Sequence, residues 1–144
     1  MWPRVLAVWL LIMLVESMMG ALREAMVSMG IVDGAIARRA GVFVGVLFIY
    51  AMALVTTRWI ARGGRLAARC WLAIGLVWAG LTVLFEIAIG RVLTADWPAL
   101  WQRLAEDYDP RRGGLMLLGL GAMALAPWLA ARANRHVARG ELSR

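Results

Sequence analysis

Two glutamates stand inside apolar runs, and a carboxyl group in that setting is the chemically most capable feature of this chain. Glu16 lies in the first apolar run and Glu86 in the third, 70 residues apart. A carboxylate in the hydrocarbon core costs at least about 2.5–3.5 kcal/mol on insertion scales, so each must face protein or water. Such a group either pairs with a cation and fixes neighbouring helices, or exchanges a proton or cation coupled to a solute.

Arginines near the ends of the apolar runs are the expected partners of these acids. One arginine pair opens the second run and another opens the fourth, and the two pairs begin 73 residues apart. A bidentate bond between a guanidinium and a carboxylate would compensate part of the desolvation cost. The sequence predicts a buried-charge site of Glu16 and Glu86 with Arg39 and Arg112, and with Arg23 and Arg91 as helix-end alternatives.

Glycines accompany the acids at helical spacing. Gly20 and Gly90 each follow a glutamate by four residues, and Gly41 and Gly45 form a Gly-x-x-x-Gly motif at the start of the second run. Small residues let helix backbones approach closely in a membrane. We therefore expect these four glycines to lie at helix contacts.

The elements that must position these residues are membrane-spanning helices. The chain has 144 residues, of which 62% are hydrophobic, against about 45–50% in soluble domains. Apolar runs of about 20 residues cross a bilayer as helices, since a helix satisfies its own backbone hydrogen bonds. We predict a single all-α membrane domain over 1–144, a bundle of four transmembrane helices at about residues 5–22, 41–60, 71–93 and 114–131. The first run has no Ala-x-Ala-like site after it, and we expect it to be retained.

The sequence contains an internal repeat of one helical-hairpin pattern. The order Glu-x-x-x-Gly, arginine pair and apolar run occurs in each half, and Ala-Met-Ala-Leu recurs at residues 51 and 122. Two tandem hairpins are predicted, with repeat 1 over about 1–69 and repeat 2 over about 70–144. Parallel repeats of this kind are related by an axis along the membrane normal.

Arginine distribution predicts the orientation. Four helices put both termini and the middle loop on one side, which carries nine arginines and one acidic residue. The two loops on the other side carry seven arginines and six acidic residues. By the positive-inside rule both termini are cytoplasmic.

The two outer loops differ in pattern. Residues 96–108 predict a short amphipathic helix lying at the membrane interface, with an apolar face of Trp97, Leu100, Trp101, Leu104 and Tyr108. The stretch 24–37 contains Gly30 and Gly34, and there we expect no regular helix.

Several functional classes find no support in the residue pattern. No hydrolytic triad, zinc-ligand spacing, phosphate loop or haem motif is present, so we expect neither an enzyme nor a cofactor. Five methionines between residues 13 and 29 could suggest a copper site, but core packing explains them better, and no metal is expected. The net charge of +7 comes from arginines that flank apolar spans, which favours anionic lipid headgroups over nucleic acid as the partner.

Several short segments resemble an uncharacterised group of small bacterial four-helix membrane proteins. The segments are Phe85 to Arg91, Glu106 to Asp109, Arg112 to Leu115, Glu16 to Met18 and Gly41 to Gly45. The group often has Asn where this chain has Asp109. The resemblance implies a bacterial inner-membrane location and no known activity.

Together these patterns predict a non-catalytic structural or accessory subunit of a membrane assembly, with membrane lipids and either copies of itself or a larger complex as partners. The alternative is a small proton- or cation-coupled transporter. Four helices leave little room for an enclosed pathway, so that alternative requires an oligomer.

Overall fold

The computed structural model of the chain describes residues 1–61, 66–93, 96–109, 111 and 114–141. These residues form α-helices and no β-strand. The helices are α1 (Trp2–Ser28), α2 (Gly34–Ala61), α3 (Ala68–Leu93), α4 (Trp97–Tyr108) and α5 (Met116–Glu141). All except α4 are long and apolar enough to cross a membrane. The prediction of an all-α chain with four long apolar helices is therefore confirmed.

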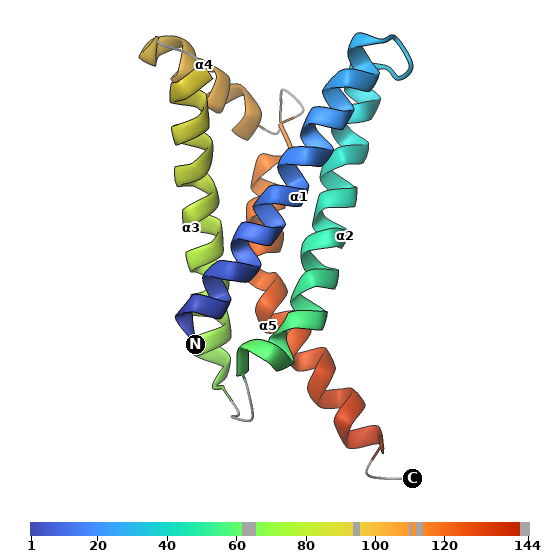
Figure 1. Cartoon of the computed structure of the whole chain (residues 1–144), viewed down its shortest axis with the longest axis vertical. Helices are drawn as coiled ribbons and strands as arrows, with labels where there is room; N and C mark the ends of the chain where they lie inside the picture. Colours follow the sequence, from blue (N-terminus) through green and yellow to red (C-terminus); the bar gives the residue numbers. More distant parts are fainter. Residues whose placement is uncertain (62–65, 94–95, 110, 112–113, 142–144) are drawn as a thin grey trace.

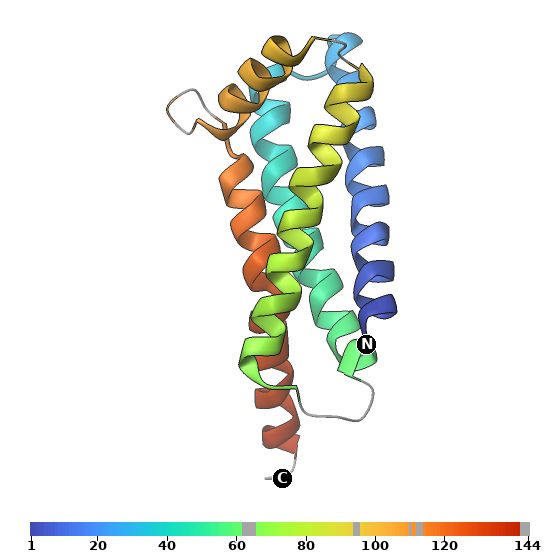
Figure 2. The same ribbon diagram turned by 90° about the vertical axis from the view of Figure 1, so that its left-hand side faces the viewer.

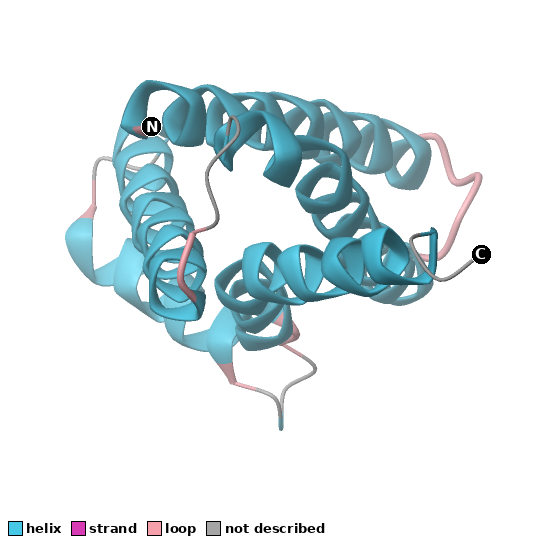
Figure 3. Ribbon diagram, turned by 90° about the horizontal axis from the view of Figure 1, so that it is seen from below, coloured by secondary structure: helices cyan, strands magenta, loops and turns pink. Residues whose placement is uncertain are grey.

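Helix α5 is the central element of the bundle. It packs extensively on both α2 and α3, whereas α1 packs on α2 and touches α3 over a shorter stretch. Figure 1 shows α1 and α2 side by side, with α3 opposite them and α5 in between. Both termini lie at one end, and α4 crosses the other end (Figures 1 and 2). The view along the bundle in Figure 3 shows the long helices tilted against one another.

The first helix runs beyond the apolar stretch that predicted it. It continues to Ser28, and two residues later the chain turns away at Gly30, whose φ of 70° lies in the left-handed region that glycine tolerates. The backbone N–H of Gly30 donates to the carbonyl of Val27, and that of Ile31 to Met26. This pattern is a Schellman motif, which satisfies the last carbonyls of the helix.

The second helix begins earlier than predicted, at Gly34. The side-chain oxygen Oδ1 of Asp33 accepts hydrogen bonds from the backbone N–H groups of Ala35, at 2.8 Å, and Ile36, at 3.2 Å. An aspartate in this position caps a helix N-terminus. The prediction that 24–37 lacks a regular helix is therefore wrong: helix ends here are set by capping groups rather than by the limits of the apolar runs.

The tightest helix contact joins α3 to α5. Gly75 is buried, and a Cβ atom at this position would overlap the backbone carbonyl of Ala124. Close backbone approach of this kind increases van der Waals contact, which drives helix association where lipid and side chains are equally apolar. The fully buried Ile74 and Trp78 extend the same core along α3.

Indole and hydroxyl groups join α1 to α3. The Nε1–H of the fully buried Trp78 donates to the backbone carbonyl of Val5 at 3.0 Å, and that of Trp9 donates to Oγ1 of Thr82 at 3.1 Å. The Thr82 hydroxyl lies 2.9 Å from the carbonyl oxygen of Trp78 and 3.0 Å from the sulfur of Met123 on α5. These groups are therefore satisfied inside the bundle, as buried polar atoms require.

A second polar contact joins α2 to α5 near the end that carries the termini. The amide nitrogen of Asn134 donates to the carbonyl of Leu54 at 3.0 Å and to the hydroxyl of Thr57 at 2.8 Å. Interhelical hydrogen bonds of this type contribute about 0.6 kcal/mol on average in membrane proteins.

The close approach at Gly75 generates a first prediction. Gly75→Ala will lower the free energy of unfolding by about 1–3 kcal/mol, because the new methyl group meets backbone atoms that cannot rotate away. The measurement is the apparent melting temperature of the purified protein in a mild detergent.

Gly80→Ala is the matched control on the same helix. Apart from its own helix backbone, no atom of the described residues lies within 4 Å of the position that its Cβ would occupy, so helix propensity favours alanine there, by about 1 kcal/mol or less. Equal melting temperatures for the two variants would contradict the close packing of α3 on α5.

Candidate intramembrane carboxylate site

Both glutamates lie in the half of the bundle nearer α4. Helices α1 and α3 both start at the end that carries the termini (Figure 1), and the Trp9–Thr82 hydrogen bond sets their relative register. Glu16 follows Trp9 by seven residues and Glu86 follows Thr82 by four, about 10 and 6 Å further along their helices at 1.5 Å per residue. The two carboxyl groups are therefore at related depths.

Glu16 packs against the Gly-x-x-x-Gly motif of α2. Its carboxylate oxygens lie 2.9 and 3.0 Å from the position that a Cβ of Gly45 would occupy. The side chain is half-buried, and within the described part of the chain it has no hydrogen-bond or ion-pair partner. The space left by the glycine is thus filled by a carboxyl group.

Arg23 occupies the neighbouring part of the same motif. Its Nη1 lies 3.3 Å from the position that a Cβ of Gly41 would occupy. Glu16 and Arg23 are seven residues apart and so share one face of α1, while Gly41 and Gly45 are one turn apart on α2. The two glycines together form a groove that accommodates one acidic and one basic side chain of α1.

Glu86 accepts a hydrogen bond from a residue of α4. The phenolic hydroxyl of Tyr108 donates a hydrogen bond to Oε2 of Glu86 at 3.2 Å. One turn further along α3, a Cβ on Gly90 would overlap the side chain of Leu100, which is 2% exposed. Helix α4 therefore covers the end of α3 through one polar and one apolar contact.

The remaining residues of the predicted site have other surroundings or lie outside the described part of the chain. Arg39 is exposed and lies two residues before Gly41, hence on the side of α2 turned away from the groove. The Arg91 guanidinium lies 4.8 Å from the ring centre of Trp97 on α4, a cation–π contact. Arg112 lies outside the described residues. At Gly20 no atom of another described element lies within 4 Å of the Cβ position.

Sequence reasoning missed the polar partners of this site. Tyr108 was expected to belong to the apolar face of the short helix, yet its hydroxyl is the group that contacts Glu86. Its spacing from Trp97 and Leu104 predicts a shared face but not the element which that face meets. Asn134, which bonds α5 to α2 at the other end of the bundle, carries a clearer signal, since an amide beside an apolar span is expected to bond across helices.

Chemically, the arrangement offers two carboxyl groups in different surroundings. The Glu86 carboxylate accepts a phenolic hydrogen bond, whereas the Glu16 carboxylate is held beside glycine without such a donor among the described residues. The first environment suits an acid that fastens two helices together. The second suits an acid that can exchange a proton.

Comparison with known proteins gives no match to a family model, to a curated protein or to a solved structure. The resemblance to a group of bacterial four-helix membrane proteins therefore stays a prediction.

Tyr108 supplies a pH-dependent readout of the contact between α4 and α3. Burial, and next the negative charge of Glu86, raise the pKa of Tyr108 from its ordinary value of about 10 to about 12. A raised folded-state pKa means that the stabilising contribution is fully present below pH about 10 and is lost as the pH rises through about 12.

Tyrosinate absorbance in a Tyr50→Phe background isolates this group, because the chain has two tyrosines. We expect Tyr108 to ionise near pH 12. Glu86→Gln in the same background will lower that pKa, since the neighbouring charge is removed while burial is retained. Ionisation of Tyr108 at its ordinary pKa would contradict the contact.

Proposed function

We propose that this chain is a non-catalytic structural or accessory subunit of an assembly in the bacterial inner membrane. Four helices suited to cross a bilayer support a small multi-pass membrane protein. The observation that carries the proposal is the hydrogen bond from Tyr108 to Glu86. Through this hydrogen bond the Glu86 carboxylate has a structural role, because it links α4 to α3.

Open glycine positions support docking on another protein. Outside their own helix backbones, no described atom lies within 4 Å of the Cβ positions of Gly20 on α1 and Gly80 on α3, and the same is true of Gly119 and Gly121 on α5. Such positions allow the backbone of a further helix to approach closely. A larger assembly or a second copy of the chain would use these faces.

The orientation and the repeat are part of the same proposal. Both termini lie at one end of the bundle (Figure 1), and the arginine excess of that end supports a cytoplasmic location for it under the positive-inside rule. The pairs α1–α2 and α3–α5 would then be two copies of one hairpin, and α4 would lie at the opposite membrane interface.

A proton- or cation-coupled transporter acting as an oligomer is the second candidate. Glu16 favours it, because this carboxylate has no hydrogen-bond donor among the described residues. A second chain packed on α1 and α2 would be required to enclose a pathway beside the groove.

Variants of Tyr108 and Glu86 distinguish a structural role of the Glu86 carboxyl group from a role in proton transfer. Tyr108→Phe will lower the free energy of unfolding by about 1 kcal/mol, because Glu86 loses its donor. Glu86→Gln will be tolerated, since the amide oxygen still accepts the phenolic hydrogen. Tyr50→Phe is the control: within the described chain the Tyr50 hydroxyl makes no hydrogen bond.

Purification of the tagged chain from its native membrane in mild detergent tests the assembly itself. We expect co-elution with other proteins in a complex larger than a homo-oligomer, and reduced recovery of those partners with Tyr108→Phe. A self-contained oligomer whose proton or cation flux in liposomes is abolished by Glu16→Gln or Glu86→Gln, at unchanged melting temperature, would overturn the proposal in favour of transport.

A further inference from the structure

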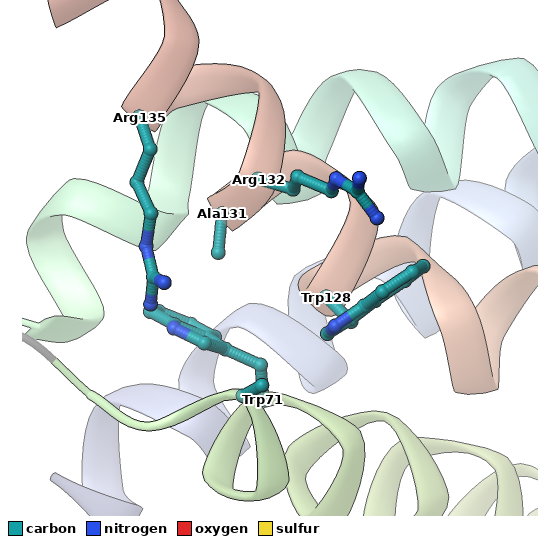
Figure 4. Close-up of a pocket in the computed structure, with 6 residues that line it drawn as sticks. Trp71, Trp128, Ala131, Arg132 and Arg135 are labelled. Carbon is teal, nitrogen blue, oxygen red and sulfur yellow. The ribbon is translucent and has the colours of Figure 1, made fainter. Parts of the chain in front are cut away.

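A cavity of about 300 Å³ lies between α3 and α5 at the end of the bundle opposite α4. It is lined by Ala68, Trp71, Trp128, Ala131, Arg132 and Arg135. Figure 4 shows the Trp71 and Trp128 indoles on two sides of the hollow, with Arg135 extending from α5 toward Trp71 and Arg132 lying above Trp128. The cavity belongs to neither carboxylate and is unused by the proposed function.

The walls of this cavity combine apolar surface with cationic groups. The Trp71 indole is 4% exposed, and its neighbours in the wall are methyl groups of alanine. The guanidinium of Arg132 lies 5.6 Å from the ring centre of Trp128, which holds it at the rim. Arg135 donates from Nη2 to the carbonyl of Leu66 at 2.7 Å.

Both guanidinium groups retain donors for a ligand. Each carries five N–H donors, and only the Arg135 bond to Leu66 is made within the described residues. Neither arginine has a carboxylate partner there. Three further arginines lie toward the same end of the bundle, namely Arg4, Arg58 and Arg69. The electrostatic potential around the cavity is therefore positive, and no described acidic side chain at this end compensates it.

The depth of the cavity matches the boundary between hydrocarbon and headgroups. Arg132 and Arg135 lie in the last turn of the apolar span that ends at Arg135, and Trp71 lies in the first turn of α3. Tryptophan and arginine favour this level of a bilayer, and basic pockets between helices there bind anionic headgroups.

We propose that this cavity binds the phosphate group of an anionic phospholipid, with Arg132 and Arg135 as the phosphate donors and the two tryptophans packing on the adjoining glycerol and acyl chain. The shared chemistry is a phosphate oxyanion. A lipid is favoured over free phosphate because apolar side chains make up most of the wall and the site opens at headgroup depth. The inference rests on the membrane placement of the chain and not on its role in an assembly.

The test uses the full chain in a non-ionic detergent, titrated with short-chain phosphatidylglycerol or phosphatidylcholine and followed by native mass spectrometry. We expect saturable binding of phosphatidylglycerol and little retention of phosphatidylcholine. The double variant Arg132→Gln, Arg135→Gln will weaken phosphatidylglycerol binding about tenfold or more, since two arginine contacts are lost.

A matched control removes the same charge from the same end of the bundle. Arg58→Gln with Arg69→Gln changes two exposed arginines that do not line the cavity. Binding within about twofold of the unchanged chain is expected for this control. An equal loss in both double variants would show that net charge alone attracts the lipid and would overturn the site.

Two further results would also overturn the proposal. Equal retention of phosphatidylcholine, whose phosphate is balanced by its own choline cation, would contradict the proposed preference for an anionic phospholipid. Displacement of phosphatidylglycerol by inorganic phosphate at equal concentration would assign the site to free phosphate. Melting temperatures of the variants in lipid-free detergent, expected to be unchanged, exclude loss of fold as the cause.

Discussion

The close contact of α5 with α3 at Gly75 is the constraint on which the remaining arrangement depends. Helix α5 packs on α2 as well as on α3, while α1 meets α3 over only a short stretch. The two sides of the bundle are therefore joined mainly through α5. Because lipid tails are as apolar as the side chains, this joint relies on shape, and only glycine leaves room for the carbonyl of Ala124.

Polar groups supplement that packing at three depths along the bundle. Asn134 bonds α5 to α2 near the termini, Thr82 receives the Trp9 indole in the middle, and Tyr108 reaches Glu86 at the end covered by α4. Each contact satisfies a group that lipid cannot satisfy. The two ends of the bundle therefore differ: Glu16 and Glu86 lie toward α4, and a cavity lined by two arginines lies at the opposite end.

Sequence patterns predicted the four long apolar helices, because hydrophobicity over about 20 residues is a local property. They wrongly predicted that the stretch 24–37 contains no regular helix. The capping signals were present in Gly30 and Asp33, but hydropathy does not record them. They also could not assign partners to the acids: spacing gives the face of a residue on its own helix, and not the rotation of the helix opposite.

Local sequence patterns were enough to predict four helices apolar and long enough to cross a membrane, with two acids at related positions in the first and third. The contacts of each acid depend on the folded bundle: Glu86 meets Tyr108 of α4, and Glu16 meets Gly45 of α2. The physical reason is that span and face follow from the local period of the helix, whereas a contact depends on the tilt and rotation of two helices that the whole bundle sets together.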